Sequence, residues 1–130
     1  MPVVASACLC GVNCRWHGRR RGKIKVIREL EEAGIEVIPV CPETLAGLSV
    51  PRAPVKTIKG RVYVTDAETR TEVGVELTEV FKAGASKALQ IARNAGALKA
   101  YFFMYSPSCS PSGIAGKIFK AAGIQVIPVR

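Results

Sequence analysis

The sequence has no apolar run of the roughly 18 residues that a membrane-spanning helix needs. Its start, MPVVASAC, lacks the basic segment and the long apolar stretch of a secretion signal. No low-complexity segment or linker interrupts the chain, whose 130 residues suffice for one ordinary core but not for two. These absences argue against a membrane protein and predict a cytoplasmic protein with a single domain over residues 1–130.

Histidine and acidic residues are also scarce. The single histidine and the cysteine spacings C-x-C and C-x-x-x-C match no common zinc framework. Ten acidic residues against 19 lysines and arginines leave a net charge of +9, part of it in RWHGRRRGKIK. This basic segment makes an anionic partner such as RNA plausible, with contacts through Arg19, Arg20, Arg21, Lys23 and Lys25.

Apolar runs alternate with helical patterns along the chain. Strands are predicted at residues 2–7, 35–41, 100–105 and 124–129, and helices at 23–34, 77–95 and 114–123. Alternation around Lys59-Gly60 indicates a hairpin at 55–65, and AGIEVIPVC at 33–41 is nearly repeated as AGIQVIPVR at 122–130. The order predicts an α/β fold: an open, mainly parallel sheet with helices on both faces and a small β-hairpin excursion.

Three of the five cysteines follow predicted strands. Cys8 comes after the first strand, Cys41 ends the second, and Cys109 lies four residues beyond the strand at 100–105. Carboxyl ends of parallel strands form the edge at which open α/β sheets bind ligands. In a reducing cytosol, thiols are better explained as ligands or nucleophiles than as disulfides. The three positions therefore predict a cluster or metal site whose fourth position stays free.

The other two cysteines have no comparable placement, and we interpret Cys10 and Cys14 as packing residues. One alternative stays open for Cys10, because C-x-C in an extended stretch points both thiols to the same side. Cys10 would then compete with Cys8 as a ligand.

Three segments together resemble the signatures of a known family. SACLCGVNCRWHG, VCPETLAGL with the following PR, and SPSC are similar to the motifs of the small bacterial and archaeal domains that include thiouracil desulfidase. The resemblance spans most of the chain in the expected order. It implies an enzyme that removes sulfur from a thiolated pyrimidine such as thiouracil, releasing sulfide without net electron transfer.

The resemblance also implies site residues. A 4Fe-4S cluster would be held by Cys8, Cys41 and Cys109, with the fourth iron open to the substrate sulfur, and Glu43 and Ser106 would be the catalytic pair. Glu43 is placed to activate water or move protons, and Ser106 to hydrogen-bond the substrate or relay a proton. Ordinary structural roles are the alternative: Glu43 as an acidic residue at a helix N-terminus, and the serines of SPSCSPSG as turn residues.

The sequence departs from the family pattern at several positions. Cys10 stands where leucine is usual, His17 replaces an aspartate, Ser110 replaces a glycine, and the segment between Cys109 and the final helix is short. These departures concern the pocket, and therefore the substrate, more than the cluster. Two other functions stay open: desulfuration of thiolated bases in transfer RNA, and a non-enzymatic iron-sulfur or zinc binding module.

Overall fold

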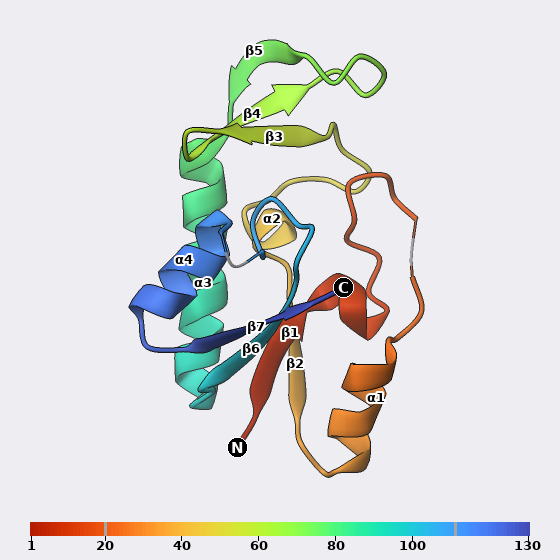
Figure 1. The fold of residues 1–130 in the computed structure, drawn as a ribbon, viewed down its shortest axis with the longest axis vertical. Helices are drawn as coiled ribbons and strands as arrows, with labels where there is room; N and C mark the ends of the chain where they lie inside the picture. The colour runs from red at the N-terminus through yellow and green to blue at the C-terminus, as the bar shows by residue number, and fades with distance from the viewer. Residues whose placement is uncertain (20, 111) are drawn as a thin grey trace.

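The computed structural model describes residues 1–19, 21–110 and 112–130. Within them the main sheet has parallel strands in the order β2-β1-β6-β7 (Figure 1). These strands are β1 (Val3–Ser6), β2 (Val37–Val40), β6 (Lys99–Phe103) and β7 (Gln125–Val129). None of the described helices combines the length and the apolar character that a bilayer crossing demands.

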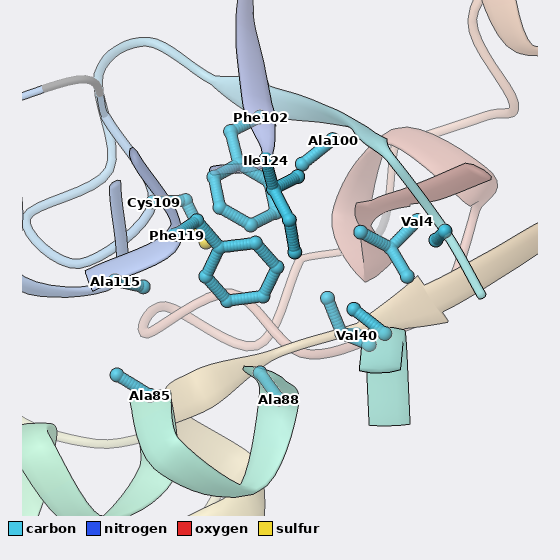
Figure 2. Packing of buried hydrophobic residues seen from close by; sticks show 12 residues of the cluster. Val4, Val40, Ala85, Ala88, Ala100, Phe102, Cys109, Ala115, Phe119 and Ile124 are labelled. Atoms are coloured by element: carbon cyan, nitrogen blue, oxygen red, sulfur yellow. The ribbon is translucent and has the colours of Figure 1, made fainter. Parts of the chain in front are cut away.

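Helices cover both faces of this sheet, as α1 (Lys25–Glu32), α3 (Thr78–Ala95) and α4 (Ile114–Ala121). Successive residues of β1 point to opposite faces, so Val4 packs with α3 and α4 whereas Ala5 packs with Ile27 of α1. On the α3 and α4 side, Phe102 and Phe119 meet edge to face with ring centroids 4.9 Å apart (Figure 2). The predicted α/β class with helices on both faces is confirmed.

A second, antiparallel sheet lies beyond the N-terminal end of α3 (Figure 1). It contains β3 (Val55–Ile58), β4 (Arg61–Thr65) and β5 (Glu72–Glu76). The predicted hairpin is confirmed, and Lys59 and Gly60 both have positive φ in its turn, as tight two-residue hairpins require. The strand β5 was not predicted, although EVGVE alternates as a strand does, and every one of its residues is exposed.

Two short helices shape the edge of the main sheet. The 3₁₀ helix η1 (Ala7–Cys10) follows β1 directly, and α2 (Pro42–Leu45) begins immediately after β2 and Cys41. Helix α2 crosses α3 so closely that a Cβ on Gly84 would lie 1.8 Å from the Pro42 carbonyl oxygen. Only glycine fits at this crossing, which fixes the start of α2 against α3.

The repeated segments 33–41 and 122–130 supply the two outer strands, β2 and β7. The Val3 N–H donates to the Glu36 carbonyl, so in and next to β2 the backbone N–H and C=O groups of even-numbered residues point toward β1. The Gln125 N–H donates to the Leu98 carbonyl, so the backbone N–H and C=O groups of the odd-numbered residues of β7 point toward β6. The prolines of the repeat, Pro39 and Pro128, therefore turn their hydrogen-free nitrogens to the open sides of the sheet.

Candidate active site

A cavity of about 300 Å³ opens where β1, β2 and β6 end. Its polar and sulfur-bearing walls come from segments far apart in the sequence: Ser6, Cys8, Cys14, Cys41, Glu43, Arg52, Ser106, Ser108 and Cys109. Trp16, Phe103 and Tyr105 supply aromatic surface. The carboxyl edge of the parallel strands thus carries the site, as the rule for open α/β sheets anticipates.

The three cysteines predicted as ligands all line this cavity. Cys8 is held in η1, Cys41 is the residue between β2 and α2, and Cys109 lies in the loop before α4. The Cys109 side chain also belongs to the core on the α3 and α4 side, and Figure 2 shows its sulfur beside Phe119. Burial raises the pKa of the Cys109 thiol to about 12.

A fourth thiol, Cys14, lines the same cavity, although the sequence indicated only a packing role for it. It is buried, and the thiols of Cys8 and Cys41 lie near enough to act on the pKa of its own thiol. Hydrogen bonding with Cys14 lowers the pKa of Cys41 to about 6 and also lowers the pKa of Cys8. The same two contacts raise the pKa of Cys14.

Cys10 is not among the residues that line the cavity. Burial raises the pKa of its thiol to about 11, and Glu31 and Lys23 are the charged side chains that act on it. Because Cys8 and Cys10 lie in a 3₁₀ helix rather than an extended stretch, C-x-C does not turn both thiols to one side.

Glu43 is in the first turn of α2 and is only 7% exposed. The Arg52 Nε donates to Glu43 Oε2 at 2.8 Å, and Arg52 Nη2 contacts the same oxygen. The Ser108 hydroxyl donates to the other oxygen, Oε1, at 3.3 Å. Both carboxylate oxygens therefore have partners outside α2, although an acidic residue in a first helical turn is also favoured by the helix dipole.

Ser106 and Ser108 connect this carboxylate to Cys109. Ser106 Oγ accepts the backbone N–H groups of Ser108 at 3.3 Å and of Cys109 at 3.1 Å, which is the turn role that its sequence context allowed. Its hydroxyl also lies 3.3 Å from Ser108 Oγ, which is itself 3.8 Å from Cys109 Sγ. Ser108, buried and beside Cys109, was not predicted as a site residue; only its position within SPSC could have indicated it.

Three of the four described basic residues that are predicted to contact RNA interact with other side chains of the protein. The Arg21 guanidinium carbon lies 4.9 Å from the centroid of the Phe103 ring. Lys23 forms an ion pair with Glu31, and Lys25 forms one with Glu29. Arg19 is exposed, and Arg20 lies outside the described residues. The arginines that line the cavity are instead Arg15, Arg52 and Arg70, the last with its guanidinium 5.3 Å from the Trp16 ring centroid.

The donor set of the cavity fits an iron-sulfur cluster, because such clusters are held by cysteine thiolates. No described group of three or more His, Cys, Asp or Glu side chains is gathered closely enough for one metal ion. Thiolates of a cluster bind separate irons and need not converge on one point. The cavity therefore fits a cluster by the chemistry of its donors, which are soft sulfur atoms. A carboxylate and hydroxyl groups line the same cavity.

Fold and site together define a small α/β domain in which thiols line a cavity at the carboxyl edge of the parallel strands. A model of the 2-thiouracil desulfurase family matches residues 3–127, and the chain belongs to this family. The resemblance seen in the sequence motifs is thereby confirmed.

Two individual proteins show how far the similarity extends. The uncharacterized protein YbbK of Bacillus subtilis (strain 168) is 30% identical over 143 residues, covering 96% of this chain and 93% of YbbK. The solved structure of the 4Fe-4S-dependent thiouracil desulfidase TudS superposes with a TM-score of 0.83 at 27% identity. That match covers 98% of this chain and 89% of TudS.

Proposed function

We propose that this chain is a 4Fe-4S-dependent desulfidase that removes sulfur from a thiolated pyrimidine such as thiouracil and releases sulfide. The observation that carries this proposal is the cavity on which Cys8, Cys41 and Cys109 meet a buried glutamate. Similarity to TudS over nearly the whole chain supports it. The cavity volume, about 300 Å³, is at the lower end of the range for small-molecule sites and suits a single base.

In this proposal Cys8, Cys41 and Cys109 hold the cluster. When bound, the cluster supplies a Lewis-acidic iron that polarises the thiocarbonyl sulfur. The overall reaction is a hydrolysis: water adds to the carbon, the carbon-sulfur bond breaks, and the sulfur leaves as hydrosulfide with no change in oxidation state. We assign the cytoplasm as its compartment, because reducing conditions keep cysteines out of disulfides and so available as ligands.

The protein side chains supply the proton transfers. Glu43 would take a proton from the attacking water, and Ser106 would hydrogen-bond the base or pass a proton on. Trp16 and Phe103 would exclude bulk water and offer flat apolar surface to a planar ring.

Anaerobic preparation of the full chain tests the function. We expect a brown protein with about four irons per chain that releases sulfide from 2-thiouracil. Cys109→Ser protein, prepared in the same way, is the matched control and should release none. Stoichiometric zinc without iron, or a full cluster with no sulfide release, would contradict the desulfidase and favour a metal-binding module.

A further inference from the structure

The Glu43 carboxylate is held asymmetrically. Its Oε2 receives hydrogen bonds from both Nε and Nη2 of Arg52. Its Oε1 receives, among the residues that the structure describes, only the longer bond from Ser108 Oγ, at 3.3 Å. Both side chains of the ion pair are about 10% exposed, so this contact is made largely out of water. The oxygen with the weaker partner is the one that faces the serines and Cys109.

Arg52 makes three further hydrogen bonds, all to backbone carbonyl groups. Besides Glu43, its Nη1 donates to the Ser49 carbonyl at 3.1 Å and its Nη2 to the Cys14 carbonyl at 2.9 Å. Its backbone N–H donates to the Trp16 carbonyl at 2.7 Å. The guanidinium therefore links the start of α2 to the segment that carries Cys14 and Trp16, two walls of the same cavity.

We propose that Arg52 is a positioning residue for the desulfidase reaction: it occupies Glu43 Oε2 and so reserves Oε1, next to Ser108, for the proton transfer. This inference rests on the proposed function, in which Glu43 is the proton acceptor. A carboxylate oxygen already bound by two N–H groups of a cation is the poorer proton acceptor. Ser108, hydrogen-bonded to Oε1 and 3.3 Å from Ser106 Oγ, connects the reserved oxygen to the second catalytic candidate.

Lysine cannot reproduce this arrangement. A planar guanidinium reaches the carboxylate and two carbonyl groups at fixed angles, whereas an ammonium group is a point charge with a compact set of donors. Arg52→Lys keeps the charge opposite Glu43 and so avoids an unpaired buried carboxylate. It therefore separates the loss of orientation from the loss of charge.

Steady-state kinetics of iron-loaded Arg52→Ala and Arg52→Lys, with 2-thiouracil, test the proposal. We expect kcat to fall about 100-fold in Arg52→Ala, with KM changed much less and iron per chain retained, because misplacement of a reacting group lowers the rate on this scale. Arg52→Lys should lose roughly 10-fold in kcat. Added guanidinium ion should restore kcat of Arg52→Ala but not of Glu43→Gln, and the exposed Arg93→Ala is the matched control.

Unchanged kcat in Arg52→Lys would overturn the proposal, and so would a loss of kcat in Arg52→Ala that parallels a loss of iron and resists guanidinium. The crystal structure of Arg52→Lys gives a readout independent of turnover: we expect the Glu43 carboxylate to rotate away from Ser108. A carboxylate that keeps its place would contradict the positioning role. A wild-type protein that releases no sulfide would refute the proposed function instead, and the rotation would still decide the role of Arg52.

Discussion

At the scale of single residues, burial and hydrogen bonding give the thiols of the cavity different acidities. The pKa of Cys41 is lowered to about 6 by hydrogen bonding with Cys14, whereas burial raises the pKa of Cys109 to about 12. Metal ligation requires the thiolate. Cys41 is therefore the predicted ligand that ionises most readily, and Cys109 the one that depends most on a cation.

Serine variants test the ligand assignment. Iron binding should be lost when Cys8, Cys41 or Cys109 is replaced by serine, because each variant removes one of the three proposed thiolates. Cys10→Ser should keep most of the iron, since Cys10 is not part of the cavity wall. The measurement is iron per chain after anaerobic reconstitution.

Cys14→Ser is the most informative of these variants. We expect it to keep most of its iron, because three ligands suffice in the proposed site. A loss as complete as that of Cys41→Ser would show that the thiol between Cys8 and Cys41 is itself a ligand.

Glu43→Gln tests the proton acceptor. The amide has the size of the carboxylate but cannot take up the proton, so we expect iron to be retained and kcat for sulfide release to fall at least about 100-fold. Ser106→Ala should act in the same direction, more mildly. Turnover of Glu43→Gln equal to wild type would mean that the carboxylate takes no part in activating water.

The sequence could indicate only part of this site. The positions of Cys8, Cys41 and Cys109 after predicted strands indicated them as ligands. The family motifs indicated Glu43 and Ser106. The contacts of Arg52 and Ser108 join segments far apart in the sequence, which no local pattern encodes. Arg52 reaches the Cys14 carbonyl 38 residues away, and Ser108 reaches a carboxylate 65 residues away.

At the scale of secondary-structure elements, the crossing of α2 and α3 controls where two site residues lie. Gly84 lets the Pro42 carbonyl approach α3, and Cys41 and Glu43 flank Pro42. The closest approach is to backbone, which cannot move aside as a flexible side chain can. A change in packing at Gly84 would therefore displace a predicted ligand, Cys41, and the predicted proton acceptor, Glu43.

Gly84→Ala is accordingly expected to destabilise the protein by about 1–3 kcal/mol or more, despite the better helix propensity of alanine. It should also lower the iron retained after reconstitution, because the start of α2 must shift. Urea unfolding and iron analysis are the measurements, and the exposed Ser86→Ala on the same helix is the control. Stability equal to wild type would show that α2 can move without cost.

Burial explains why α3 was predictable from the sequence and contributes nothing to β5. The sequence predicts a long helix over 77–95 because its small apolar residues form one stripe. The observed helix α3 begins at Thr78. In β5, Val73 and Val75 are 52% and 49% exposed, so pairing with β4 rather than burial forms the strand.

At the scale of the whole molecule, the net charge of +9 predicts weak, salt-sensitive attraction to any polyanion. We expect free 2-thiouracil to be turned over better than thiolated transfer RNA, because two lysines of the basic segment are paired and Arg21 packs on Phe103. Turnover of both substrates at about 50 and 200 mM salt checks this expectation. Arg19→Ala, at an exposed position, should leave turnover of the free base unchanged.

Efficient turnover of transfer RNA would promote the alternative function. It would have to fall steeply with salt and collapse when Arg19, Arg20 and Arg21 are neutralised together, since each lost phosphate contact reduces the salt dependence. Binding alone, without turnover, would reflect only the charge of the molecule.

The prolines of the repeated segments limit how copies of the molecule can associate. An unprotected outer strand is a template on which another chain can add a strand, the first step toward fibrous aggregates. Pro39 and Pro128 each remove a hydrogen-bond donor from the open side of an outer strand, one on each side of the sheet. The near-identity of AGIEVIPVC and AGIQVIPVR thus has a colloidal consequence: both borders of the main sheet resist growth by strand addition.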